Sequence, residues 1–386
     1  MLLFCVIFTA CMSTNNRVVV SVTNDLVTDN RVDKVCTFLV SQGYEVLLVG
    51  RKRRKSPEMP RRDYATKRMR LLFEKGPFFY AEYNFRLFWL LLFRKANVLV
   101  SNDLDTLLAN YLTHKLKGGK LVYDSHEFYT EVPELVSRPR VRRIWLSIEK
   151  WIFPKLKLVY TVNESIADAY NERYGLLPKV VRNISPKYVG KDPSSKKELG
   201  IPENKKLIIL QGAGINIHRG AEEAVEAMRK VDNALLLIVG DGDVIPQLKE
   251  TVEKENLSDK VLFFGRRPYL EMMQFTAHSD LGLTLDKDNN LNYKFSLPNK
   301  VFDYIHAGTP IVCTDLVEVA KVVRRNDVGV VLNEFTVDHL ADALNTLLKD
   351  EKELSRFKEN CRLAAEKENW EKECEVLNSI YPKIEN

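Results

Sequence analysis

The chain has 386 residues, which is longer than one ordinary domain and predicts two or three. Hydrophobic residues make up 45% of it and charged residues 28%, as in soluble globular proteins, which excludes a disordered or collagen-like chain. The longest nearly uninterrupted apolar stretch, residues 1–12, is shorter than the roughly 18 residues of a membrane-spanning helix, so we do not expect a spanning protein.

Residues 1–16 resemble a signal peptide only in part. They lack positive residues ahead of the apolar stretch, and cleavage before Cys11, as in a lipoprotein, fits poorly. We interpret the segment as an unstructured or spurious leader, with Met12 or a nearby residue as the effective start. The six cysteines of the chain are scattered without metal-ligand spacing, which predicts reduced thiols in a cytoplasmic protein.

The net charge of +6 is unevenly distributed, because residues 1–185 carry +12 and residues 186–386 carry −6. Residues 51–70 hold ten Lys or Arg against two acids and precede an aromatic, leucine-rich segment, 71–93. Such a combination is typical of surfaces that bind anionic lipid, so residues 51–93 are predicted to bind the inner membrane surface. Nucleic acid is a rival partner that we do not adopt. A solvated loop followed by a buried core helix stays an open alternative, because residues 87–93 are apolar all round.

Short β-branched runs alternate with longer helical patterns, as in βαβ units with a parallel sheet. The first series of predicted strands is 17–22, 44–50, 97–101, 120–124 and 156–162, and the second is 206–212, 234–242, 261–265, 280–285, 309–313 and 328–332. About two dozen residues after Arg182, with Pro, Ser, Gly and Lys and little periodicity, separate the series. The pattern predicts two doubly wound α/β domains, 17–185 and 186–366, with a C-terminal helix in 367–386 packing back on the first.

The sequence lacks the motifs of several classes of enzyme. The turn after the first strand reads TNDLVTDNR, without a glycine, which argues against a nicotinamide or flavin oxidoreductase. A phosphate loop, a zinc-protease helix and a nucleophile elbow are also missing. Neither clustered carboxylates nor a DxD pair suggests a metal, so we expect neither a metal nor a cofactor.

The block FSLPNKVFDYIHAGTPIVCTD, residues 295–315, resembles the donor-site helix of the retaining glycosyltransferases of family 4, also called group 1. LIILQGAGINIHRG and LLLIVGDGD resemble the first strands and turns of that family's donor domain, and YDSHEFYTEVPEL is similar to a segment of its first domain. The resemblance extends from Arg17 to about Leu377. It implies the GT-B fold, in which two Rossmann-like domains face a cleft, and a UDP- or GDP-linked sugar as co-substrate. The donor would bind the second domain, and a glycan or polyprenyl-linked acceptor the first.

The diphosphate of such a donor needs fixed cations and helix N-termini. Arg219 precedes the first helix of the second domain, and Lys300 follows Pro298 and Asn299 at the start of another. A cation at a helix N-terminus is unfavourable unless an anion binds there, so we expect Arg219 and Lys300 to converge on one anion site.

Asp303 occupies the position where family members usually carry a glutamate that holds the ribose hydroxyls, and aspartate is one methylene shorter. A second glutamate, usual eight positions earlier, is Phe295 here. The complete predicted donor-binding set is Gly212, Gly214, Arg219, Gly240, Arg266, Pro298, Asn299, Lys300 and Asp303.

In the first domain, His126 lies just past a predicted strand, at the sheet edge where ligands of open α/β sheets bind. The resemblance implies that His126 faces the reacting sugar with Glu127 beside it, and both are predicted catalytic; a packing or capping histidine is the alternative. Asn102 and Asp103 end the preceding strand and either contact the acceptor or cap the next helix. Arg31 is the third acceptor-side residue.

Together these observations predict a glycosyltransferase peripheral at the inner membrane surface, acting with retention in cell-surface polysaccharide biosynthesis. The alternatives are a nucleotide-sugar epimerase of GT-B fold and, because Phe295 replaces an acid, a catalytically silent GT-B interaction module.

Overall fold

The computed structural model describes residues 16–27, 29–188 and 194–384. The contacts between residues divide the chain into two compact units: the first is Met1–His126, Arg143–Tyr160 and Asn378–Asn386, and the second is Glu127–Arg142 and Thr161–Leu377. The domain boundary between residues 185 and 186 stays a prediction. The proposed leader lies, except for Asn16, outside the described residues.

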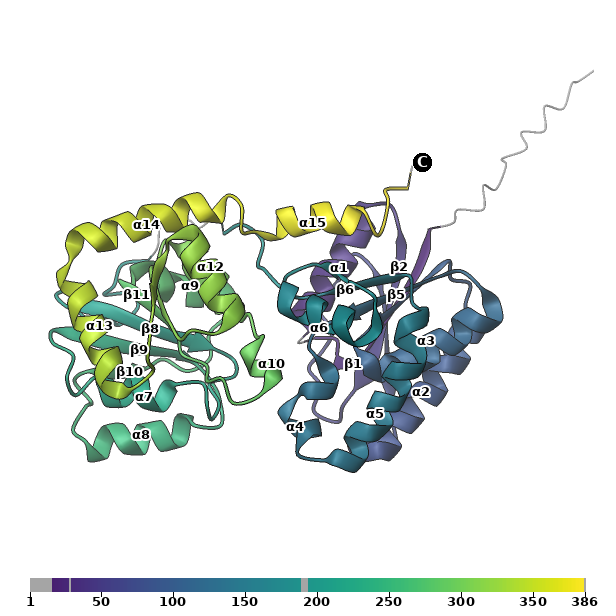
Figure 1. The fold of residues 1–386 in the computed structure, drawn as a ribbon, viewed down its shortest axis with the longest axis horizontal. Helices are drawn as coiled ribbons and strands as arrows, with labels where there is room; N and C mark the ends of the chain where they lie inside the picture. The colour runs from purple at the N-terminus through teal and green to yellow at the C-terminus, as the bar shows by residue number, and fades with distance from the viewer. Residues whose placement is uncertain (1–15, 28, 189–193, 385–386) are drawn as a thin grey trace, which may run out of the picture. The chain divides into compact units, whose positions relative to one another are not determined.

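A seven-stranded sheet has the order β3-β2-β1-β4-β5-β6-β7. Its strands are β1 (Arg17–Asp25), β2 (Glu45–Lys52), β3 (Ala65–Arg70), β4 (Val98–Asn102), β5 (Lys120–Ser125), β6 (Leu158–Thr161) and β7 (Lys179–Val180). The pairings from β3 through β5 are all parallel. The helices between them are α1 (Asn30–Ser41), α2 (Gly76–Phe93), α3 (Leu104–Lys117), α4 (Pro133–Val136), α5 (Pro139–Ile152) and α6 (Glu164–Tyr174), with 3-10 turns at Tyr129–Glu131 and Phe153–Lys155 (Figure 1). This arrangement confirms the predicted doubly wound sheet.

Two strands of this sheet were not predicted. The basic stretch 51–70 contains β3, so the expectation of a loop is wrong for Ala65–Arg70. Lys67 and Arg70 of β3 are exposed and Met69 is buried, and such charged residues are tolerated because β3 is an edge strand. The two-residue strand β7 is too short to leave a pattern in the sequence.

Helix α2 has two apolar faces with different surroundings. Phe79, Tyr83, Leu87 and Leu91 are buried. The opposite face, which we call the apolar face of α2, consists of Phe78, Phe85, Trp89 and Phe93, which are 43–79% exposed. The alternative of a fully buried core helix is therefore wrong for half of the helix. Within the described residues, helices long and apolar enough to cross a membrane are absent.

The second sheet has six strands in the order β10-β9-β8-β11-β12-β13. They are β8 (Lys206–Gly212), β9 (Ala234–Gly240), β10 (Val261–Phe263), β11 (Leu281–Thr284), β12 (Ile311–Cys313) and β13 (Gly329–Val331). The accompanying helices are α7 (Ala221–Ala227), α8 (Ile245–Lys254), α9 (Tyr269–His278), α10 (Leu291–Lys294), α11 (Lys300–Ala307), α12 (Val317–Asn326), α13 (Val337–Lys349), α14 (Glu351–Ala365) and α15 (Trp370–Asn378) (Figure 1). All its pairings are parallel.

Alternation along β8 explains why its sequence is apolar at every position. Ile208 and Leu210 belong to one core cluster, with α7, α8 and α13, whereas Leu207 and Ile209 belong to another, with α11 and α12. A strand covered by helices on both faces needs apolar residues in both directions. The burial of this sheet on both faces places its polar residues at strand ends.

The end of the chain contacts the first unit. The Tyr44 hydroxyl donates to the carbonyl of Pro382 at 2.9 Å, and the amide of Ile384 donates to the carbonyl of Gln42 at 3.0 Å. In the second unit, Glu373 of α15 accepts hydrogen bonds from the Arg182 side chain and backbone. The described cysteines include the buried thiols Cys36, Cys313 and Cys361.

Candidate functional site

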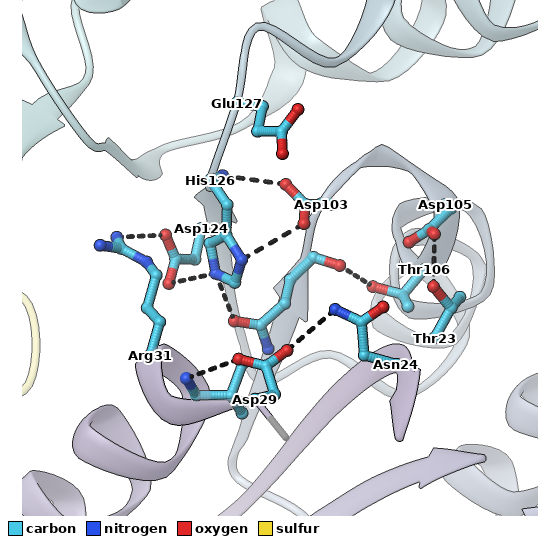
Figure 2. Close-up of polar contacts among 12 residues, drawn as sticks. Thr23, Asn24, Asp29, Arg31, Asp103, Asp105, Thr106, Asp124, His126 and Glu127 are labelled. Atoms are coloured by element: carbon cyan, nitrogen blue, oxygen red, sulfur yellow. Dashed lines mark hydrogen bonds and ion pairs between the residues drawn. The ribbon is translucent and has the colours of Figure 1, made fainter. Parts of the chain in front are cut away.

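His126 follows β5, and its imidazole is held by carboxylates at the carboxyl ends of β4 and β5 (Figure 2). Nδ1 lies 3.3 Å from Asp103 Oδ2, and Nε2 lies 3.1 Å from Asp124 Oδ2 and 3.2 Å from the amide oxygen of Asn102. Burial lowers the pKa of His126, but Asp103 and Asp124 outweigh it and raise the pKa from 6.5 to about 9. The ring is therefore an imidazolium at neutral pH.

Asp124 also accepts a hydrogen bond from Arg31 Nη2 at 2.8 Å, and both side chains are almost completely buried (Figure 2). Burial opposes the charged carboxylate, but Arg31 and His126 lower the pKa of Asp124 to about 2. The Arg31 side chain is only 5% exposed, so an acceptor could reach little of it. Its predicted contact with the acceptor stays a prediction. In this structure Arg31 orients Asp124, which in turn orients His126.

Asp103 adopts a backbone conformation that side chains other than glycine rarely take, with φ of 58°. It stands at the N-cap position of α3, yet its side chain makes no capping hydrogen bond, so the capping alternative is wrong for Asp103. Its Oδ1 instead accepts from the amide of His126 at 2.9 Å. Asn102 is buried and donates to the carbonyl of Ser21 at 3.0 Å. Asn102 and Asp103 thus both contact His126 and hold it in place. The backbone strain at Asp103 is typical of functional sites.

Asp105 is a second buried acid near this cluster that the sequence analysis missed. Its Oδ2 accepts from the Thr23 hydroxyl at 2.5 Å (Figure 2), whereas its Oδ1 has no hydrogen-bond partner in the described chain. Burial and the charge of Asp103 raise the pKa of Asp105 to about 7. Asp105 is therefore partly protonated at neutral pH.

Glu127 belongs to the second unit. Its exposed carboxylate accepts a hydrogen bond from the side-chain amide of Asn292 at 3.3 Å. The catalytic roles of His126 and Glu127 stay predictions.

In the second unit Arg219 pairs with the buried carboxylate of Asp286, which follows β11. Arg219 Nη1 lies 3.4 Å from Asp286 Oδ1, and its guanidinium lies 5.2 Å from the centre of the Tyr293 ring. Lys300 is the first residue of α11. Burial lowers the pKa of Lys300, the charge of Asp286 raises it, and the charge of Arg219 lowers it, so the three groups interact. Asp286 beside Arg219 was not predicted, and the convergence of Arg219 and Lys300 on one anion site stays a prediction.

Close backbone approach fixes the loops that carry these cations. Gly220 follows Arg219 with φ of 75°, and a Cβ there would lie 2.3 Å from the Leu285 side chain, so glycine is required. A Cβ on Gly240 would lie 1.8 Å from the carbonyl oxygen of Gly212. Gly212 and Gly240 thus pack together at the carboxyl ends of β8 and β9, and Gly214 lies in the turn that follows.

Asp303 is buried, and side chains from separate segments of the protein donate hydrogen bonds to its carboxylate. Ser185 Oγ and the Tyr269 hydroxyl donate to Oδ1, each at 3.1 Å, and Gln211 Nε2 donates to Oδ2 at 3.4 Å. These donors were not predicted, because they come from segments far apart in the sequence. A ribose would have to share this carboxylate with them, so the predicted role of Asp303 stays a prediction.

The remaining predicted donor residues are placed only by their positions in the chain, and their roles stay predictions. Pro298 and Asn299 directly precede α11, and the side chain of Asn299 makes no capping hydrogen bond. Arg266 is exposed on the loop after β10. Among the described residues, groups of three His, Cys, Asp or Glu arranged for a metal are absent. The chemistry that the arrangement offers is anion binding by two cations beside a helix N-terminus.

Two parallel α/β sheets with polar residues at their carboxyl ends define a protein of the GT-B class. Sucrose-phosphate synthase from Thermosynechococcus elongatus has this fold at a TM-score of 0.78 and 16% identity, covering 95% of this chain and 98% of that one. WaaG, a glycosyltransferase involved in lipopolysaccharide biosynthesis, matches at a TM-score of 0.71 and 17% identity, covering 95% of this chain and 99% of that one. Anabaena HepE in complex with UDP and glucose matches at 0.70 and 14% identity, covering 94% and 100%.

The sequence narrows this class to a family. Residues 191–364 match the glycosyl transferases group 1 model and residues 29–186 match the glycosyltransferase family 4 model. The chain therefore belongs to the group 1, family 4 glycosyltransferases, as the sequence analysis predicted. It is 29% identical to an N-acetyl-alpha-D-glucosaminyl L-malate synthase of Bacillus anthracis over 40% of this chain and 39% of the relative. It is 24% identical to an alpha-D-kanosaminyltransferase of Streptomyces kanamyceticus over 46% of each. These alignments span less than half of either curated relative.

Proposed function

We propose that the protein transfers a sugar from a UDP- or GDP-linked donor to a glycan or polyprenyl-linked acceptor, with retention, in cell-surface polysaccharide biosynthesis. The observations that carry the donor class are Lys300 as the first residue of α11 and Arg219 on the glycine-bounded loop before α7, each a cation at the start of a helix. HepE, which has the same fold, is known in complex with UDP-glucose, and this supports a nucleotide sugar. Retention and the acceptor class are proposed from the family resemblance.

In the proposed reaction, the bond between the sugar and the diphosphate breaks and the nucleoside diphosphate leaves with an added negative charge. Arg219, Lys300 and the amide groups at the start of α11 stabilise that charge, which grows toward the transition state. His126 and Glu127 are proposed to contact the sugar. The imidazolium of His126, held by Asp103 and Asp124, would present a fixed positive group to it.

Incubation with UDP- and GDP-sugars and a lipid-linked acceptor tests this proposal. We expect release of nucleoside diphosphate together with a glycosylated product whose anomeric configuration equals that of the donor. Interconverted sugar without transfer would instead indicate an epimerase. Nucleotide binding without any turnover would indicate a catalytically silent module. This outcome has to be tested because Phe295 stands where family members usually have an acid.

We also propose that the first unit docks on an anionic membrane through the apolar face of α2 and its neighbouring cations. Arg53, Arg54 and Lys55 are exposed on the loop before β3, and the Arg54 side chain, although it lies 4.0 Å from Glu74, stays 92% exposed. Other cations of this stretch have protein partners: Arg62 pairs with Asp33 and Arg68 with Asp25, while Arg51 packs over a phenylalanine ring at 4.5 Å. The exposed cations and aromatic rings together fit a lipid headgroup region, each cation adding about 1 kcal/mol.

Sedimentation with phosphatidylserine vesicles tests the docking. Changing Arg53, Arg54 and Lys55 to Gln should reduce vesicle binding by at least tenfold at low salt, because about 3 kcal/mol of attraction is lost. The matched control changes the exposed Lys254, Lys352 and Lys367 to Gln and should bind as the wild type does. Wild-type protein that stays in the supernatant at low salt would refute the docking and favour a soluble acceptor.

A further inference from the structure

The Arg219 guanidinium contacts a carboxylate and an aromatic ring, and neither contact is a hydrogen bond. Its Nη1 lies 3.4 Å from Asp286 Oδ1, which is longer than the roughly 2.7–2.9 Å of a charge-assisted hydrogen bond. Nε is buried and has no hydrogen-bond partner among the described residues. The carboxylate of Asp286 therefore attracts the guanidinium but does not by itself fix its orientation.

The aromatic contact is with Tyr293 of α10, and it uses the flat face of the guanidinium. The guanidinium carbon of Arg219 lies 5.2 Å from the centre of the Tyr293 ring, within the roughly 6 Å over which a cation attracts an aromatic face. A stacked guanidinium keeps its N–H groups in its own plane, away from the ring. Stacking thus holds an arginine in place while its donors stay available for a bidentate contact with phosphate.

The loop that carries Arg219 has a constrained backbone. Arg219 stands between His218, with φ of 68°, and Gly220, with φ of 75°. A side chain other than glycine rarely takes such a conformation, and strain of this kind is typical of functional sites. The amide of Lys287 donates to the carbonyl of His218 at 3.1 Å, which ties the loop to the segment after β11. The backbone of Arg219 is therefore held close to the segment that leads into α10.

The backbone of Tyr293 is also held, at both of its hydrogen-bonding groups. Its amide donates to Oδ1 of Asn290, the residue that caps α10, at 2.9 Å. Its carbonyl accepts from the amide of Ser296 at 3.0 Å. These bonds fix the one-turn helix α10, so the ring of Tyr293 is presented to Arg219 from a defined position.

We propose that Tyr293 is a positioning residue of the diphosphate site, whose ring holds the Arg219 guanidinium and leaves its N–H groups available for phosphate oxygens. This inference rests on the proposed function, since it assigns Arg219 to the diphosphate of the donor. A carboxylate hydrogen-bonded to the guanidinium would occupy the same donors that the phosphates need, whereas an aromatic ring does not. Tyr293 therefore acts through Arg219 and not by contact with the phosphates.

Calorimetric titration of the whole chain with UDP, GDP, uridine and guanosine tests the inference. Tyr293→Ala should weaken binding of whichever diphosphate the wild type binds by about threefold to tenfold, as expected when a partly buried cation–π contact is lost. Binding of the matching nucleoside should stay unchanged. In the Arg219→Ala background, Tyr293→Ala should have no further effect on the diphosphate, because the two residues act as one unit.

Two conservative variants separate the π face from simple packing. Tyr293→Phe keeps the ring and should bind the diphosphate within about twofold of the wild type. Tyr293→Leu keeps an apolar side chain without a π face and should bind as Tyr293→Ala does. The matched control is Leu291→Ala on the same helix, which should bind as the wild type does, since Leu291 is 44% exposed.

The outcomes distinguish failure of the inference from failure of the proposed function. Equal losses of diphosphate and nucleoside in Tyr293→Ala, or wild-type binding by Tyr293→Leu, would reduce Tyr293 to a packing residue and overturn the inference alone. Tighter diphosphate binding by Tyr293→Ala, or an undiminished loss in the Arg219→Ala background, would also overturn it. Wild-type protein that binds neither diphosphate would contradict the proposed donor site itself, and the inference with it.

Discussion

The carboxyl ends of the two sheets carry opposite electrostatics. In the first unit the imidazole of His126 lies between the carboxylates of Asp103 and Asp124, which raise the pKa of His126. In the second unit a buried carboxylate, Asp286, lies 3.4 Å from Arg219, and the pKa of Lys300 is lowered by burial and by the charge of Arg219. The carboxyl end of a sheet thus serves two purposes: the first cluster keeps the His126 ring positive at neutral pH, whereas cations of the second unit are proposed to bind an anion.

The largest expected effect is on the first cluster. Asp124→Asn should lower the free energy of unfolding by about 3–5 kcal/mol, because it leaves the buried Arg31 without its anion. Urea denaturation measures the loss, and Asp63→Asn, an exposed acid on the loop before β3, is the control. A loss below about 1 kcal/mol would mean that the buried pair contributes little, and the comparison of the two clusters would then lose its basis.

The charge of His126 gives a pH signature. Its folded-state pKa is about 9 against 6.5, so the stability that it contributes is complete below pH 6.5 and is lost as pH rises through 9. Wild-type protein should therefore lose about 2 kcal/mol more than His126→Gln between these pH values. Parallel stability profiles for the two proteins would show that the imidazole is not held as a cation.

The smallest effect concerns Asp105, whose pKa is raised to about 7 from 3.8. The unfolded chain ionises this carboxyl from about pH 4 upward, whereas the folded chain resists until about pH 7, so the wild type loses stability over that interval. Asp105→Asn should stabilise the protein by about 1–2 kcal/mol at pH 7.5 and by nothing at pH 4. Equal effects at both pH values would assign the change to the hydrogen bond with Thr23 and not to charge.

Sequence patterns predicted both sheets, because strands buried on two faces are continuously apolar, as in β8. They missed β3, whose polar residues satisfy an edge position, and they did not reveal that α2 buries only one of its two apolar faces. His126 was selected from the sequence because polar residues at the carboxyl ends of strands are often functional. Applied to KLVYD and LGLTLD, the same rule would also have found Asp124 and Asp286.

Other partners were beyond prediction from the sequence. Ser185, Gln211 and Tyr269 meet at Asp303 only because the second unit folds a linker, a strand and a helix start around it. Their spacing along the chain has no periodicity that links them. The same holds for Thr23 and Asp105, 82 residues apart, whose contact depends on the packing of β1 against α3.

The central claim is that Arg219 and Lys300 bind the diphosphate of a nucleotide sugar. Calorimetry of wild-type protein and Lys300→Ala with UDP, GDP, uridine and guanosine tests it most directly. We predict that one diphosphate binds the wild type and that Lys300→Ala weakens it by about 1.5–3 kcal/mol, the value of a charge-assisted hydrogen bond, while binding of the matching nucleoside is unchanged. An equal loss for the nucleoside and the diphosphate, or no loss for either, would contradict the claim.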